Sequence, residues 1–460
     1  MGKTDEPDEA IGPQCVQPTA AIPNMTKHIQ HDTPVDDTWL ILSYCSNADG
    51  RAAALHIDNR LPYLKNMGIR PVMLTGPNFP RHKDIPHARV PSLAPSGILF
   101  EFRAFVNLAI RTKIVRHFLK MLCLLPILPF YLIEKGVFDI ESQWSWFILA
   151  AVRGDRLIHK HQAKLIYSTG GSISAHLAAC LIARWNRIPW IAEFQDPLVH
   201  DGWLRSRCAF RIYAKFERVI CAHASHVVFL TEKACERATA RTSLGDRGRI
   251  IYPGAMPSVI PAASYVRGEF CHFTHLGSLG GTRNLKVFLE ALALYFADNP
   301  TMIPLLRLDL YGKCDQPSLK IIASLPHPEV IRDCGRVSHI ESLAVMKRAD
   351  VLLLIQDTEE FSSETIPSKS YEYLLAARPI LGLVYRNQEL RDILIESGHQ
   401  AADATNVLDV KKGIAEMIEQ WRSDTFVPCP SPYTVEAAVD SLVCIAAHLT
   451  GRKFPDTAHD

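Results

Sequence analysis

Short apolar runs alternate along the chain with longer stretches in which apolar residues recur every three or four positions. Runs of the first kind predict buried strands, and stretches of the second kind predict helices. Strands that alternate with helices favour parallel sheets, because each helix carries the chain back to the edge where the strand began. The first series of predicted strands comprises residues 38–44, 71–75, 163–169, 189–194, 225–231 and 249–254.

A proline-rich stretch at residues 253–264 separates this series from a second one of the same kind. We therefore predict two doubly wound α/β domains, at residues 37–258 and 259–430. Residues 431–460 contain a last helical pattern that could pack on either domain, including back on the N-terminal one, and a tail. The second series of predicted strands comprises residues 270–278, 305–312, 329–335, 349–356 and 378–385.

Composition excludes several classes of function. Of the 460 residues, 48% are apolar and 21% are charged, and the formal net charge of +2 gives no general attraction to nucleic acid. The twelve cysteines include no CxxC pair and no spacing typical of zinc ligands, which favours reduced thiols in the cytoplasm and no metal site. Residues 1–36 contain five prolines and no sustained apolar period, so we expect a disordered leader.

The most apolar run, residues 121–133, has thirteen uncharged residues. About 20 are needed to span a bilayer, and Pro126 and Pro129 are expected to break an interior helix, so the run is predicted not to cross a membrane. Around it, residues 101–167 hold ten Lys or Arg against five Asp or Glu. This composition suits peripheral contact with an anionic membrane, and core helices beneath a solvated face would have it too.

A glycine-rich turn follows the predicted strand that ends near Leu276. Glycines allow backbone amides to approach a ligand, and the start of the next helix offers free N–H groups, which together suit a phosphate. The turn fits a plain structural role equally well, because the GxGxxG spacing of dinucleotide folds is absent. Its candidate residues are Gly277, Gly280, Gly281, Arg283 and Lys286.

Residues 362–381 place Glu364 and Glu372 eight positions apart, with Lys369 between them. Thr365 or Ser368 is predicted to cap a helix here. A carboxylate on the first turns of such a helix can accept two hydrogen bonds from vicinal hydroxyls such as those of a ribose. The alternative is a solvated surface on which the acids favour the helix dipole and pair with the lysine.

The order of four motifs resembles the nucleotide-sugar domain of GT-B glycosyltransferases, most closely the retaining group called family 4. The motifs are the turn at Gly277, "YGKCD" at residues 311–315, "GRVSHIESLAVMKRADVLLL" from Gly335, and the E-x7-E segment. Ser278 stands where many members of this group have arginine, and the segment "IPSKSYEY" resembles a branch with PSKxxEY at this place.

The resemblance implies a role for each matching residue. Glu372 would bind the ribose, Glu364 would lie beside the donor sugar, and Arg283 would hold the diphosphate, with no cofactor and no metal. The implied catalytic residues are Arg283, Lys369 and Glu364. The implied nucleotide-sugar site comprises Gly277, Ser278, Gly280, Gly281, Arg283, Lys286, Ser368, Lys369 and Glu372.

The first half resembles the acceptor-binding domain of the same enzymes. "IPWIAEFQDPLVHDGW" at residues 188–203 looks like the strand and loop that line their cleft, with Glu193 and Asp196 where two aspartates are usual. Ser172 is predicted to cap a helix on this side, and His176 could face an acceptor. A histidine in an apolar helix is more often a core residue, and Asp196 could instead order its loop.

These observations predict a GT-B fold with two Rossmann-like domains facing a cleft. The predicted function is transfer of a sugar from a nucleotide-diphosphate donor such as a UDP-sugar to a glycan or lipid-linked acceptor. The family resemblance implies that the transfer retains the anomeric configuration. The predicted setting is cell-surface polysaccharide synthesis in the cytoplasm or at the inner face of the cell membrane. The alternatives are a nucleotide-sugar epimerase on the same scaffold and a non-catalytic sugar-nucleotide-binding subunit.

Overall fold

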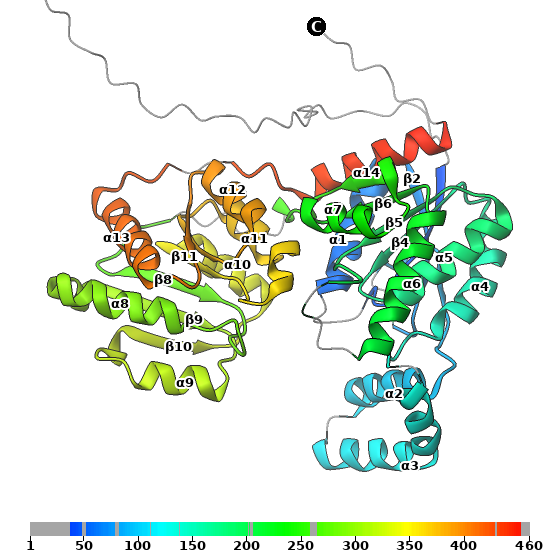
Figure 1. Cartoon of the computed structure of the whole chain (residues 1–460), viewed down its shortest axis with the longest axis horizontal. Coiled ribbons are helices and arrows are strands. Elements are labelled where there is room, and N and C mark those ends of the chain that lie inside the picture. Colours follow the sequence, from blue (N-terminus) through cyan, green and yellow to red (C-terminus); the bar gives the residue numbers. More distant parts are fainter. Residues whose placement is uncertain are drawn as a thin grey trace, which may run out of the picture.

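The computed structural model describes residues 37–47, 52–78, 82–110, 112–137, 139–200, 202, 206–257, 265–427 and 430–451. The predicted leader and residues 258–264, where the predicted domain boundary falls, lie outside the described residues. The described chain forms two sheets, each flanked by helices, that lie side by side (Figure 1). All strand pairs within both sheets are parallel, which confirms the predicted α/β class.

The N-terminal sheet has the strand order β3-β2-β1-β4-β5-β6-β7, and the C-terminal sheet has the order β10-β9-β8-β11-β12-β13. In both, the order reverses beside the first strand, which places a topological switch point at the carboxyl ends of the central strands. The N-terminal strands are β1 (Asp37–Leu42), β2 (Ile69–Thr75), β3 (His87–Arg89), β4 (Leu165–Gly170), β5 (Trp190–Phe194), β6 (His226–Phe229) and β7 (Gly248–Ile250). The C-terminal strands are β8 (Cys271–Leu276), β9 (Leu306–Tyr311), β10 (Ile331–Gly335), β11 (Val351–Ile355), β12 (Ile380–Val384) and β13 (Gln400–Asp403).

The helices between these strands cover both faces of each sheet. Those of the first half are α1 (Ala52–Asn66), α2 (Pro95–Ala109), α3 (Lys113–Val137), α4 (Trp146–His161), α5 (Ile173–Asn186), α6 (Arg207–His223) and α7 (Glu232–Arg241). Those of the second half are α8 (Lys286–Asp298), α9 (Gln316–Ala323), α10 (His339–Arg348), α11 (Lys369–Ala376), α12 (Gln388–Glu396), α13 (Val407–Ser423) and α14 (Val435–Thr450).

Alternation along each strand divides the core into layers. In β1, Leu40 and Leu42 pack into one hydrophobic cluster, whereas Trp39 and Ile41 pack into the cluster on the opposite face. This is the pattern expected of a parallel strand buried on both sides. The last helix, α14, contributes Val439 to the second of these clusters and lies against α1, so the chain returns to the N-terminal domain (Figure 1).

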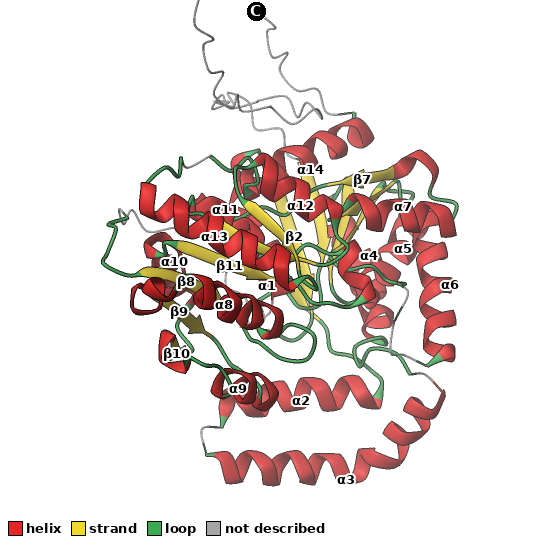
Figure 2. Cartoon of the chain, turned by 60° about the vertical axis from the view of Figure 1, so that its left-hand side comes forward, coloured by secondary structure: helices red, strands yellow, loops and turns green. Residues whose placement is uncertain are grey.

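Helices α2 and α3 form a hairpin that projects from the N-terminal domain (Figure 2). Contrary to expectation, α3 continues through Pro126 and Pro129 for 25 residues. Figure 2 shows it bending along its length, as a helix does when prolines remove backbone hydrogen bonds. By length and composition alone, α3 is long and apolar enough to cross a membrane. The thirteen-residue run is part of this longer helix, so its own length is no argument against a membrane span.

Candidate functional site

The glycine turn after β8 is folded tightly onto the loop after β9. The Gly277 amide donates to the carbonyl of Tyr311 at 2.8 Å, and a Cβ on Gly312 would lie 2.0 Å from the Gly277 carbonyl oxygen. With its φ of 149°, position 312 therefore requires glycine. The amides of Gly280 and Gly281 donate to the Arg283 carbonyl and to Asp315, respectively.

These contacts correct the expectation that the glycine amides are free to bind an anion. The amides of Gly277, Gly280 and Gly281 are all used within the protein, because the turn is built from its own hydrogen bonds. Within the described part of the turn, the exposed Ser278 keeps an amide for which no protein acceptor is recorded. Any phosphate held at this turn must be held mainly by side chains.

Two cationic side chains converge on the turn. Arg283 forms an ion pair with Asp357, which follows β11, and more than a third of its side chain stays exposed. Lys369 begins α11, and its Cε lies 3.8 Å from the position that a Cβ on Gly277 would occupy. Lys286, by contrast, is the exposed first residue of α8 and has no ion pair among the described residues. The structure thus brings Arg283 and Lys369 to the turn and gives Lys286 no comparable contact.

A buried histidine lies beneath these cations and was not singled out from the sequence. His275 is the fifth residue of β8, and its Nδ1 bonds the carbonyl of Leu353 at 2.9 Å. Burial, and then the charges of Lys369 and Arg283, lower the pKa of His275 to about 4. The imidazole is therefore neutral near pH 7, and it adds no charge of its own to the site.

Glu372 lies on the first turn of α11, one turn beyond Lys369. Its Oε2 is 4.0 Å from the Lys369 ammonium, and its Oε1 bonds Nε2 of His339 at 2.8 Å. This hydrogen bond raises the pKa of His339. Because about a quarter of its side chain is exposed, the carboxylate can reach a ligand. One short helix therefore presents both a cation and a carboxylate beside the glycine turn.

The predicted cap of α11 does not form. Ser368 precedes the helix but is exposed and makes no capping hydrogen bond, and its backbone already has helical dihedral angles of −56° and −27°. A capping residue needs an extended backbone for its hydroxyl to reach the helix amides. Thr365 bonds the carbonyl of Phe361 instead.

Glu364 lies at the contact between the two domains. It ends a short 3-10 helix (Glu360–Glu364), is only 1% exposed, and forms an ion pair of 2.6 Å with Arg237 of α7. Its carbonyl accepts a hydrogen bond of 2.7 Å from Thr231, also in the N-terminal domain. The two glutamates of the E-x7-E segment are thus used differently, since Glu372 faces the turn and Glu364 joins the domains.

On the N-terminal side, the end of β5 carries a buried charge network that sequence reasoning missed. Glu193 is fully buried and accepts hydrogen bonds from Arg60 and from Tyr167, the latter at 2.6 Å, while His56 contacts its other oxygen. Burial alone would raise the pKa of Glu193, but Arg60 and His56 outweigh it and lower the pKa. The partners come from α1 and β4, too far away in sequence for a local motif to reveal them.

Asp196 follows this strand in a loop, and its side chain is exposed to solvent. Surrounding protein atoms raise the pKa of its carboxyl, and nearby His56 partly offsets the effect. Asp196 therefore remains the candidate on this side that a ligand could reach.

The other two acceptor-side candidates point into the protein. His176 is 1% exposed, bonds Ser168 at 2.8 Å through Nδ1 and packs edge-on against Phe194, so it is a core residue. Ser172 does not cap α5, because its hydroxyl donates to Glu141 at 2.6 Å. The same Glu141 oxygen accepts from the Ser174 amide, so a distant carboxylate takes the capping role.

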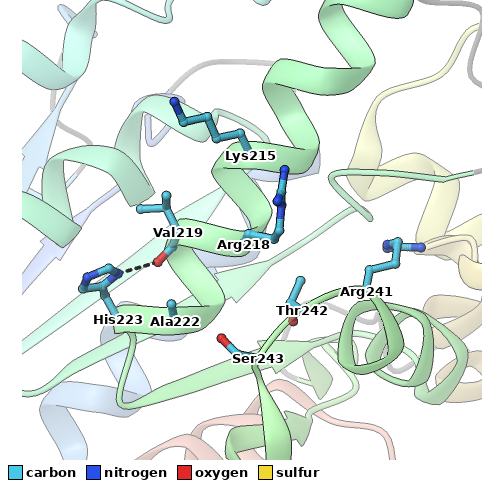
Figure 3. Close-up of a pocket in the computed structure, with 8 residues that line it drawn as sticks. All are labelled: Lys215, Arg218, Val219, Ala222, His223, Arg241, Thr242 and Ser243. Carbon is cyan, nitrogen blue, oxygen red and sulfur yellow. Dashed lines mark hydrogen bonds between the residues drawn. The ribbon is translucent and has the colours of Figure 1, made fainter.

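One pocket among the described residues lies away from these side chains. A shallow pocket of about 480 Å³ is formed where α6 meets the end of α7, and Lys215, Arg218 and Arg241 are among the residues that line it (Figure 3). None of the predicted site residues lines it. Within the described ranges, no three His, Cys, Asp or Glu side chains gather in a group that could hold a metal ion.

Comparisons with known proteins agree with this architecture. Residues 128–254 match a family described as a glycosyl transferase 4-like domain. A search of curated proteins finds no match. Among solved structures, HepE of Anabaena in complex with UDP is 12% identical, covers 90% of this chain and 98% of its own, and has a TM-score of 0.56.

Two further solved structures share the fold over similar lengths. Sucrose-phosphate synthase from Thermosynechococcus elongatus is 12% identical over 91% of this chain and 100% of its own, with a TM-score of 0.57. A protein from Listeria monocytogenes assigned as a UDP-N-acetylglucosamine 2-epimerase is 11% identical over 92% of this chain and 100% of its own, with a TM-score of 0.55. At such identities the likeness shows a shared fold, and that fold is GT-B.

Proposed function

Because the chain carries a glycosyl transferase 4-like domain within a GT-B fold, we propose that it transfers a sugar from a nucleotide-diphosphate donor to an acceptor hydroxyl. The acceptor class we propose is a glycan or a lipid-linked saccharide. The observation that carries the proposal is the convergence of Arg283, Lys369 and Glu372 beside the turn at Gly277. The structure of HepE with UDP supports uracil as the base of the donor.

The donor would lie across the carboxyl ends of the C-terminal strands. Glu372 would accept hydrogen bonds from the two ribose hydroxyls, since a carboxylate has enough lone pairs for both. Lys369, one turn earlier on α11, and Arg283 would face the diphosphate. Arg283 would exchange its partner Asp357 for phosphate oxygens, which its exposure of more than a third permits.

Cleavage of the anomeric bond leaves negative charge on the diphosphate and positive character on the sugar. Cations fixed beside the diphosphate stabilise this charge as it develops, and they need no rearrangement at the moment of reaction. We propose that transfer retains the anomeric configuration and that the departing phosphate takes the acceptor proton. The acceptor would approach from the edge of the N-terminal sheet where Asp196 is accessible.

The first experiment is a thermal-shift screen of UDP-, GDP- and ADP-sugars with the full chain, followed by donor turnover with and without candidate acceptors. A ligand that binds only the folded protein raises Tm, and the shift grows with the logarithm of the ligand concentration relative to its Kd. We expect a UDP-sugar to raise Tm in the wild type and to lose most of this effect in Glu372→Gln. Lys286→Gln, at an exposed residue outside the cluster, is the matched control and should behave as wild type.

An epimerase is the second candidate, favoured by the fold shared with the Listeria protein. It would convert the sugar nucleotide without any acceptor, whereas a transferase would release the nucleotide diphosphate in an acceptor-dependent way. Donor binding without either reaction would identify a non-catalytic subunit. We place the enzyme in the cytoplasm, at the membrane face where lipid-linked acceptors are presented, and in cell-surface polysaccharide synthesis.

A further inference from the structure

The α2–α3 hairpin exposes more apolar surface than any other part of the described chain. Ten of the 25 exposed large hydrophobic side chains among the described residues lie on α3. They include Phe118, Leu125 and Ile133, whose exposed fractions are 65%, 64% and 67%. In Figures 1 and 2 the hairpin projects from the domain, with α3 as its outer helix. Apolar patches of this extent on soluble proteins are typical of interaction surfaces.

The apolar residues of α3 form one broad face rather than a ring. At about 100° per residue, Ile114, Phe118 and Leu125 project from the same side of the helix. Lys113, Arg116 and Lys120 project from the opposite side, within the first two turns. Lys120 also bonds Asn107 of α2 at 2.6 Å, which directs this cationic side toward the inner helix.

Both acids of the hairpin are turned inward and engaged. Glu134 is buried and accepts hydrogen bonds from the Ser96 amide, the Ser96 hydroxyl and the Trp144 indole. Glu101 accepts from the Tyr44 hydroxyl and the Ser92 amide. The described residues of α2 and α3 contain no other acid, so no free carboxylate of the hairpin opposes the charges of Lys113 and Arg116.

The anchors of the hairpin also fix its position relative to the site. Tyr44 directly follows β1, and Glu101 of α2 bonds it at 2.9 Å. Because all strands of this sheet are parallel, the carboxyl end of β1 lies at the same edge as the end of β5 and the Asp196 loop. The hairpin therefore grows from the edge at which we place the acceptor.

We propose that the outer face of α3 binds the surface of an anionic lipid bilayer, with its apolar side chains among the acyl chains and its cations beside lipid phosphates. A helix with one broad apolar face and cations on the other is the kind that lies in a membrane interface. The bend of α3 and the inward anchoring of Glu134 hold the helix along this surface. This surface would deliver a lipid-linked acceptor to the edge bearing Asp196, a consequence that rests on the proposed function.

The test is flotation of the full chain with vesicles of phosphatidylcholine alone or with 30% phosphatidylglycerol, which supplies an anionic surface. We expect binding to the anionic vesicles that weakens as salt rises, because screening reduces the attraction to cations. Lys113→Gln/Arg116→Gln should lower the partition coefficient about thirtyfold, at roughly fivefold per cation near the surface. Phe118→Ser/Leu122→Ser should lower it on both kinds of vesicle by on the order of a hundredfold.

Matched controls lie on the C-terminal domain. Leu294→Ser/Leu408→Ser removes two exposed apolar side chains, and Lys320→Gln/Arg348→Gln removes two exposed cations, and neither should change partitioning. Protection of α3 amides from hydrogen exchange when wild-type protein meets anionic vesicles gives a second readout that needs no variant. Donor binding in solution should be the same for all these variants. Loss of donor binding would therefore count against the proposed function, and loss of vesicle binding against the membrane proposal.

Three results would overturn the proposal. The first is absence of vesicle binding by the wild type, and the second is equal binding by the Phe118→Ser/Leu122→Ser variant. The third is a concentration-dependent dimer in sedimentation that this variant abolishes while vesicles remain unbound, which would make the face a contact between two copies of the chain.

Discussion

The two sheets hold charged side chains at their carboxyl ends in different ways. At the end of β5 in the N-terminal domain, Glu193 is fully buried, and Arg60 of α1 and Tyr167 of β4 bond it. In the C-terminal domain, Arg283 and Glu372 pair with Asp357 and His339 while remaining partly exposed. Both edges therefore carry ion pairs, but only those of the C-terminal edge can be reached by solvent.

The two kinds of ion pair have different uses. The buried pairs keep their partners and support the structure, whereas the partly exposed pairs can exchange a partner for a ligand. Breaking the Glu193 network would leave a charge without a partner in a medium of low dielectric, so its members stay with one another. The partly exposed pairs of the C-terminal edge cost little to separate, since water and a ligand can replace either partner. We infer that the C-terminal edge binds charged substrate groups and that the N-terminal network fixes the shape of the opposite wall.

The largest expected effect is on the stability of the N-terminal network. Glu193→Ala leaves the buried guanidinium of Arg60 without its carboxylate, and we expect a loss of about 3–5 kcal/mol in the free energy of unfolding. Urea unfolding measures this loss. Glu193→Ala/Arg60→Met removes the stranded charge and should recover part of the stability. A loss below about 1 kcal/mol in the single variant would contradict a rigid wall.

The next effect concerns turnover at the C-terminal edge. Arg283→Ala should lower kcat about 10²–10³-fold, because one preset charge beside the departing diphosphate is lost, and should leave the stability near wild type. Steady-state kinetics with a UDP-sugar and acceptor measure it. Lys286→Ala, at an exposed cation without an ion pair, is the control. If Lys286→Ala instead carried the larger loss, the assignment of Arg283 would be wrong.

A smaller effect is expected for donor binding. Glu372→Ala should weaken the affinity for the donor by about 1.5–3 kcal/mol, the range for a hydrogen bond to a charged group. Calorimetric titration with the nucleotide diphosphate measures it. His339→Asn removes the protein partner of this carboxylate but leaves the carboxylate itself, so it should affect binding less. Equal affinity of wild type and Glu372→Ala for the nucleotide diphosphate would contradict the placement of the ribose at this helix.

Much of the fold could be predicted from the sequence because it depends on local patterns. The eleven strands that the apolar runs mark all form, and their period of two places alternate residues in opposite layers, as in β1. The strands β3 and β13 were missed, since they are only three and four residues long. Continuation of α3 through Pro126 and Pro129 was also missed, because packing against α2 outweighs a local preference.

The candidate site was predictable only where its residues share one element. Lys369 and Glu372 are neighbours on α11, so their spacing predicts their proximity. The pairing of Glu193 with Arg60 joins residues 133 positions apart, and that of Glu372 with His339 joins residues 33 apart. The failed cap at Ser172 has the same cause, because Glu141 competes for its hydroxyl from 31 positions away. Such partners are brought together by the tertiary fold.

The smallest expected effect uses a feature that both edges share. His176 in the N-terminal core and His275 beneath the C-terminal turn are both buried, and burial lowers the pKa of each to about 4. In the unfolded chain each histidine binds a proton as the pH falls through about 6.5, so above that pH the two histidines do not lower the free energy of unfolding. As the pH falls from 6.5 toward 4, the free energy of unfolding declines by up to about 1.4 kcal/mol per pH unit for each histidine, because only the unfolded chain takes up the proton.

We therefore expect His176→Asn to flatten the decline of unfolding free energy between pH 6.5 and 4 by up to about 1.4 kcal/mol per pH unit. Urea unfolding at a series of pH values measures the slope, and His448→Asn on the exposed surface of α14 is the control. A slope unchanged by His176→Asn would show that this histidine is protonated in the folded core, against its burial among Ser168 and Phe194.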